Sequence, residues 1–139
     1  LHSRAEIKYE SYNKAVNIEA LTMIDMTVKQ ILPAVIEYTG TLSGIIQSLK
    51  AIDVAPTVQS ELLRDIMSLL NEANAAVRVL RKMTAEASGI QDNEERAHYY
   101  HDHVMTAMDA LRSPIDSLEM LVDKEVWPMP SYGDLMFEI

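Results

Sequence analysis

The chain has 139 residues, 48% hydrophobic and 24% charged, a balance typical of one globular domain with its own core. Its formal net charge of -9, with no long Lys/Arg run, argues against binding to nucleic acid or to anionic membrane surfaces. The absence of cysteine excludes disulfides and thiolate chemistry, and no signal peptide or membrane-spanning stretch is evident. We therefore expect a soluble cytoplasmic protein.

The first predicted element is a long helix that starts near residue 17. Its apolar residues recur at alternating steps of three and four, as on one face of a helix. These residues are Leu21, Ile24, Val28, Ile31, Val35, Tyr38, Leu42, Ile45, Leu49 and Ile52. The stripe keeps its phase across Pro33, which predicts a bend in the helix rather than its end.

Residues 4–16 also have a helical pattern, with Tyr9, Tyr12 and Val16 on one side, but this stripe is out of register with the one that starts at Leu21. We therefore predict that residues 1–16 form a junction and a short helical extension. This extension either faces something other than the bundle seam or forms a separate short helix.

A second helix is predicted to follow, with Thr57 or Asp53 as its N-terminal cap. Leu63, Leu70 and Val77 widen its apolar face. The main stripe consists of Leu62, Ile66, Leu69, Ala73, Ala76, Leu80, Met83 and Ala87. Gly89 suits the left-handed conformation that often follows a helix.

A third helix is predicted to begin at Asp92, which with Glu95 forms a variant of the capping box. Pro114 lies beside the stripe and should bend this helix as Pro33 bends the first. The stripe consists of Ala97, His101, Val104, Met108, Leu111, Ile115, Leu118 and Val122.

These patterns predict an all-α fold, an antiparallel up-down-up bundle of three long helices over residues 17–125. Each helix should have about 30 to 35 residues. Residues 126–139 should form an extended tail that packs back on the bundle or on a partner, because prolines flank Met129. If Leu21, Leu69 and Leu111 are core residues, each change to Ala should cost about 2–5 kcal/mol.

The sequence offers only weak candidates for a metal site, His98, His101 and Asp102, which share one side of the third helix. Glu95 and His98 form one Glu-x-x-His motif, but the first two helices supply no matching Glu or His on their stripes. We therefore interpret His101 as a histidine at the edge of the core. No catalytic, cofactor-binding or metal-binding residue is predicted.

A different set of side chains is a candidate for protein contacts, because these residues lie off the seam or in the tail. Methionines at such positions either fill gaps or form adaptable contact surfaces. The candidates are Tyr9, Tyr12, Met23, Met26, Trp127, Tyr132 and Phe137. Asp25 is expected to pair with Lys29 one helical turn later.

Both ends of the chain resemble the C-terminal helical region of type III glutamine synthetases. The resemblance rests on Leu1–Arg4 (LHSR), Asn17–Met26 (NIEALTMIDM) with Ile31–Val35 (ILPAV), and the closing Leu121–Phe137, which contains Trp-Pro-Met-Pro-Ser-Tyr. The middle of the chain is similar in helical character only.

The resemblance implies a non-catalytic C-terminal domain whose parent joins ammonia to glutamate with ATP and Mg or Mn. The expected partners are the parent's own catalytic domain and neighbouring subunits of a homo-oligomer, without nucleic acid or membrane. Two other hypotheses stay open: a free-standing helical protein-interaction module, and a small metal-binding bundle enzyme.

Overall fold

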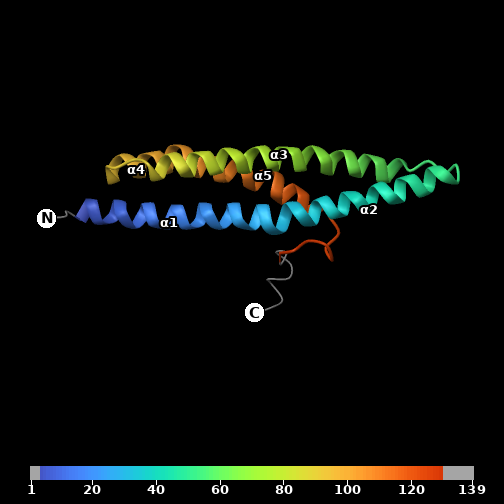
Figure 1. Cartoon of the computed structure of the whole chain (residues 1–139), viewed down its shortest axis with the longest axis horizontal. Helices are drawn as coiled ribbons and strands as arrows, with labels where there is room; N and C mark the ends of the chain where they lie inside the picture. Colours follow the sequence, from blue (N-terminus) through green and yellow to red (C-terminus); the bar gives the residue numbers. More distant parts are fainter. Residues whose placement is uncertain (1–3, 130–139) are drawn as a thin grey trace.

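The computed structural model describes residues 4–129, which form helices and connecting turns without a strand (Figure 1). Three long helical rods pack together, so the all-helical expectation is confirmed. The first rod consists of α1 (Arg4–Met26), η1 (Thr27–Ile31) and α2 (Leu32–Ala51). The second rod is α3 (Thr57–Ser88). The third consists of α4 (Asn93–Tyr99), η2 (Tyr100–Val104) and α5 (Met105–Leu121).

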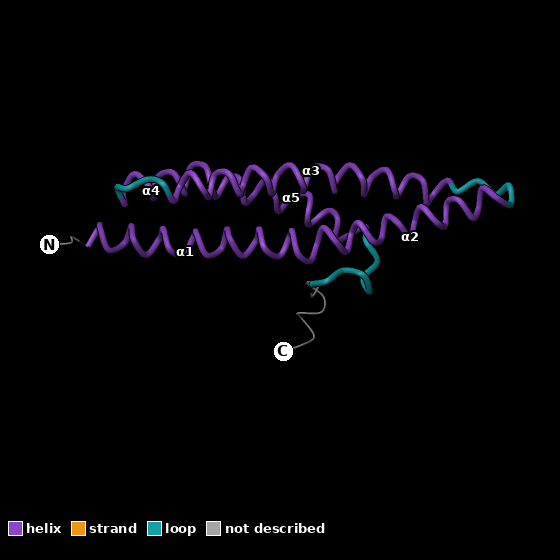
Figure 2. The backbone as a smooth tube through the Cα atoms, in the orientation of Figure 1, coloured by secondary structure: helices purple, strands orange, loops and turns teal. Residues whose placement is uncertain are grey.

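The rods alternate in direction along the chain, because the turns that join them are short (Figure 2). The third rod packs most extensively on α3, which also lies against α2. α1 packs chiefly against α4 and less closely against α3. After α5 the chain turns back toward the first rod, and residues 122–129 lie near α2 (Figure 1).

One core runs through the three rods. Its largest side chains without solvent contact come from all of them: Val35, Ile66, Leu80, Val104, Leu111, Pro114 and Leu118. Pro114 lies inside α5 and belongs to the core, rather than beside the stripe as the sequence suggested. Its missing N–H breaks one helical hydrogen bond, yet the helix continues to Leu121.

The buried stripe of the first rod differs from the predicted heptad stripe. Leu21, Val28, Ile45 and Ile52 are exposed, whereas Ile24, Ile31, Val35 and Leu42 of the predicted stripe are buried. The buried positions repeat about every 11 residues, a longer period than the heptad that was assumed. They are Asn13, Val16, Ala20, Ile24, Thr27, Ile31, Val35, Leu42 and Ile46, with Tyr38 half-buried.

The π turn η1 adds one residue between the stripes of α1 and α2. A π turn closes with i→i+5 hydrogen bonds and so contains one residue more than an α turn. The extra residue brings the stripes of α1 and α2 onto the same side of the rod. The rod changes direction where α1 gives way to α2 (Figure 1), just before Pro33. The predicted bend is therefore present, with a π turn beside the proline.

The prediction of a separate, outward-facing extension over residues 4–16 is wrong. These residues belong to α1, which is continuous from Arg4 to Met26, and Asn13 and Val16 are buried against the rest of the bundle. Their stripe seemed out of register because Leu21, which is 50% exposed, was placed in the core stripe instead of the buried Ala20. The first helical rod is consequently longer than the predicted 30 to 35 residues. How the chain divides into domains stays a prediction.

The predicted stripes of the other two rods need smaller corrections. In α3, Leu70 and Val77, which were predicted only to widen the apolar face, are buried. Four residues of the predicted main stripe are only partly buried: Leu62, Leu69, Ala76 and Met83. In the third rod His101 is exposed, so its assignment to the edge of the core is wrong. Tyr100, one residue earlier and at the start of the π turn η2, is buried in its place.

The turns between rods use other residues than predicted. Neither Thr57 nor Asp53 caps α3, whose N-terminal flank is Pro56 without a side-chain cap. Asp53 instead has φ 59° and ends α2, where the Val54 N–H bonds the Leu49 carbonyl at 2.9 Å, the pattern of a Schellman turn. Gly89 is right-handed, with φ -84°, so its predicted left-handed role is also wrong.

The cap at Asp92 is confirmed. Its carboxylate accepts a hydrogen bond from the Glu95 backbone N–H at 3.0 Å, which satisfies one of the free amides at the start of α4.

Candidate interaction surfaces

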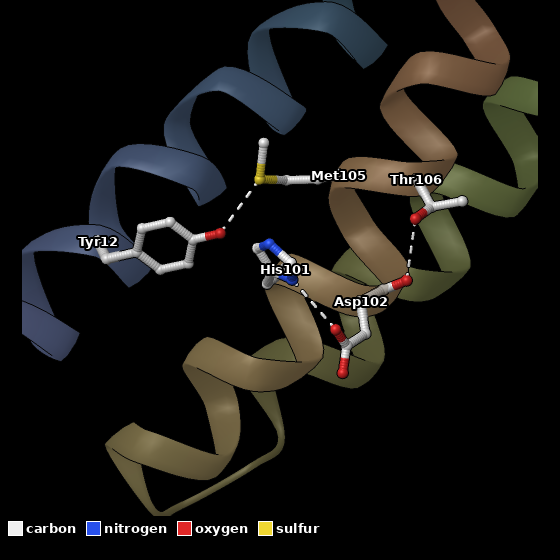
Figure 3. Close-up of polar contacts among 5 residues, drawn as sticks. All are labelled: Tyr12, His101, Asp102, Met105 and Thr106. Atoms are coloured by element: carbon white, nitrogen blue, oxygen red, sulfur yellow. Dashed lines mark hydrogen bonds and ion pairs between the residues drawn. The ribbon is translucent and has the colours of Figure 1, made fainter.

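The weak metal candidates lie on the exposed side of the third rod. His101 Nδ1 lies 3.1 Å from Asp102 Oδ1, and His98 Nε2 lies 3.9 Å from Glu94 Oε1. Figure 3 shows His101 and Asp102 turned toward each other on η2. The hydrogen bond with His101 lowers the pKa of Asp102 below its ordinary value. Residues 4–129 contain no group of three or more His, Asp or Glu side chains placed to hold a metal ion.

Two tyrosines reach from one rod to another. The Tyr12 hydroxyl on α1 donates to the Met105 sulfur at 3.1 Å, across the gap to the start of α5 (Figure 3). The Tyr99 hydroxyl donates to Glu86 Oε2 at 2.5 Å, and this hydrogen bond raises the pKa of Tyr99 to about 12. Of the seven predicted contact residues, Tyr12 therefore already has a partner inside the bundle.

The remaining contact candidates are distributed over several environments. Tyr9, Met23 and Met26 are half-buried, and Met23 packs against the core. Trp127 is only 8% exposed and belongs to the core cluster, so it anchors residues 122–129 to the bundle. Tyr132 and Phe137 lie outside the described residues. Within residues 4–129, the candidates Tyr9, Met23, Met26 and Trp127 therefore lie in different environments.

A polar network ties α1 to the start of α4. The Asn93 side-chain amide donates to Glu6 at 3.0 Å and to Glu10 at 3.3 Å. The Asn13 amide donates to the Asn93 carbonyl at 3.1 Å, while its own buried Oδ1 accepts no hydrogen bond. Sequence reasoning missed this network, because its members are common surface residues and 80 positions separate Asn13 from Asn93.

A groove, here called the α1–α3 groove, runs along the side where these two helices pack less closely. It consists of three adjoining hollows that share lining residues: Asn17 and Ser88 join the first to the second, and Leu21, Ile24 and Arg81 join the second to the third. Polar residues dominate near the start of α1, and apolar ones follow toward η1. Sequence reasoning missed the groove, although the predicted stripe already contained Leu21 and Val28.

No helix among residues 4–129 is both long and apolar enough to cross a membrane.

The chain is similar to part of known glutamine synthetases. A protein-family profile described as the glutamine synthetase C-terminal domain matches residues 1–50. A glutamine synthetase of Bacteroides fragilis (strain YCH46) is 28% identical, over 99% of this chain and 20% of the relative. For one of Butyrivibrio fibrisolvens, the identity is 31% over 100% of this chain and 20% of the relative.

A protein of Dictyostelium discoideum, named type-3 glutamine synthetase, is 31% identical over 99% of this chain and 20% of its own length. The chain thus spans about a fifth of the length of the curated relatives it matches. The resemblance to the C-terminal region of type III glutamine synthetases is confirmed, and it extends through the middle of the chain, where no motif had indicated it.

Proposed function

We propose that this chain, a match to the C-terminal region of type III glutamine synthetases, is a non-catalytic helical domain that supports the catalytic domain and subunit assembly of its parent enzyme. The observation that carries this proposal is the alignment of essentially the whole chain with one fifth of each relative. The parent would be a cytoplasmic, ATP-dependent glutamate–ammonia ligase.

The arrangement of acidic side chains among the described residues agrees with a non-catalytic role. Ligases that use ATP with Mg or Mn need clustered oxygen ligands for the cation. The acidic side chains of residues 4–129 form no such group, and those at Glu6, Glu10, Asp25 and Glu86 are engaged with neighbouring side chains. We propose that ATP and Mg or Mn bind in the remaining four fifths of the parent.

The shape of the bundle suits a buttress. The first rod is a nearly continuous helix from Arg4 to Ala51, and it packs against α3 through both α1 and α2 and against α4 through α1. A helix is about 1.5 Å long per residue, so this rod extends for about 70 Å. A rod of that length could contact both the catalytic domain and a neighbouring subunit.

Removal of the domain from the full-length parent tests the proposal. The truncated enzyme should assemble into smaller particles and lose heat stability, which light scattering after gel filtration and calorimetry would measure. A control enzyme that lacks only residues 130–139 keeps the whole described bundle. Full-size particles of unchanged stability from the truncated enzyme would contradict the proposed role.

A further inference from the structure

We propose that the α1–α3 groove receives an amphipathic segment with a carboxylate side chain, supplied by the part of the parent polypeptide that precedes this domain. This inference rests on the proposed function and adds to it the surface and the chemistry of the contact.

The first argument is the apolar surface that the bundle leaves uncovered. Leu21 is 50% exposed and Val28 37% exposed, and both line the groove. Ile18, 65% exposed, lies one turn from Leu21 on the same helix. Ile18 and Leu21 lie on neighbouring turns of α1, and Val28 lies two turns further along the rod in η1. Exposed aliphatic side chains gathered on one side of a rod are of the kind that marks an interaction site.

The second argument is the charge of the groove. Asp25 is paired with Lys29 at 2.8 Å, and Glu10 accepts a hydrogen bond from Asn93. Arg81 and Lys14, by contrast, make no hydrogen bond or ion pair within residues 4–129, although both line the groove. The charged groove side chains without a hydrogen-bond or ion-pair partner are therefore positive, and they favour a carboxylate on the segment that binds there.

The third argument concerns where the occupant comes from. Four fifths of each relative lies outside the region that this chain matches. The groove follows α1 and η1 from Glu10 to Lys29, about 30 Å at the helical rise, which is enough for an extended segment of several residues. A second copy of this domain is a poorer occupant, because each copy has a net charge of -9 and the two would repel.

Site-specific photo-cross-linking in the full-length enzyme tests the inference. A photo-reactive amino acid in place of Leu21 should cross-link to a segment upstream of this domain in which Asp or Glu lies among apolar residues. The same amino acid in place of Val58, which is 72% exposed on α3 outside the groove, serves as the matched control and should give no such product.

The charge contribution is tested by adding Arg81→Glu to the Leu21 cross-linking variant. The yield of the upstream cross-linked product should fall about tenfold, the factor that corresponds to a loss of about 1.4 kcal/mol in binding free energy. Lys82→Glu makes the same charge change at the next residue, which is exposed and does not line the groove, and should leave the yield unchanged. Circular dichroism would verify that both variants keep their helical content.

Three results would overturn the inference: a cross-link from Leu21 to another copy of this domain, no protein cross-link at all, or a yield that Arg81→Glu leaves unchanged. These failures are distinct from failure of the proposed function. If removal of the domain impairs assembly but Leu21 gives no upstream product, only the assignment of the groove is wrong. If removal has no effect while the product forms, the groove assignment stands and the supporting role is wrong.

Discussion

The Tyr99 hydroxyl donates a 2.5 Å hydrogen bond to the Glu86 carboxylate, and so joins α4 to the end of α3 across the turn at Gly89. The same hydroxyl lies 3.2 Å from the Met83 sulfur, and the Tyr99 ring centroid lies 4.5 Å from that of His103. A bond from a neutral donor to a charged acceptor disfavours loss of the donor's proton. That bond is the main reason why the pKa of Tyr99 rises to about 12.

This pKa shift predicts how stability depends on alkaline pH. The folded state holds the Tyr99 proton more tightly than the unfolded state, whose tyrosine has a pKa near its ordinary value of 10.0. The stabilisation should thus be complete below pH 10 and be lost as the pH rises from about 10 to about 12. Glu86→Gln should lower the pKa of Tyr99, which the ultraviolet absorbance of tyrosinate would report.

The matched control is Tyr38→Phe, because the Tyr38 hydroxyl makes no hydrogen bond within residues 4–129. Tyr99→Phe should destabilise the domain by about 1 kcal/mol at neutral pH, whereas Tyr38→Phe should cost less. Equal stability losses, or a tyrosinate titration that Glu86→Gln does not change, would contradict this account.

The sequence predicted the existence and the order of the helices because apolar periodicity depends on residues that are close in sequence. It failed where one extra residue changes the phase. The stripes before and after residue 27 were fitted with a strict heptad, so Leu21 was assigned to the core and Val16 to the outside. A π turn has no distinctive residue pattern, since its i→i+5 bonds are made by the backbone.

A pair of single-residue deletions tests the role of η1. Deletion of Gln30, exposed inside the π turn, should convert that turn to α-helix while the flanking stripes keep their directions. Deletion of Glu19, exposed inside α1, should rotate everything before it by about 100° and remove Val16 from the core. Thermal unfolding should show a small loss of stability for the Gln30 deletion and a large loss of stability for the Glu19 deletion.

A larger loss from the Gln30 deletion than from the Glu19 deletion would show that the π turn does not set the phase of the rod.

Alanine substitutions distinguish the observed core from the predicted one. Leu111 has no solvent contact, so Leu111→Ala should lower the free energy of unfolding by about 2–5 kcal/mol. Leu21 is half exposed, so Leu21→Ala in the isolated domain should change it by less than about 1 kcal/mol. Chemical denaturation would measure both. Equal costs would restore the heptad assignment of Leu21 to the core.

The candidate surfaces were predicted less well than the helices, for a different physical reason. Hydrogen bonds such as Asn13 to Asn93 join distant parts of the chain, and their formation depends on how the rods are aligned along their axes. Local periodicity does not determine that alignment. Trp127 is a contrasting case: the two prolines that flank Met129 predicted a tail that packs back on the bundle or on a partner, and the Trp127 ring is buried in the core cluster.

Because Trp127 is the only tryptophan in the chain, its fluorescence should report this docking directly. A ring that is 8% exposed should emit at shorter wavelength than free tryptophan and be protected from a soluble quencher. Trp127→Ala should cost about 3 kcal/mol, because burial of the ring holds residues 122–129 against the bundle. Met120→Ala is the control: it removes a large side chain that is 87% exposed, and so should leave stability nearly unchanged. Quenching as rapid as that of free tryptophan would show that the tail is not docked through this ring.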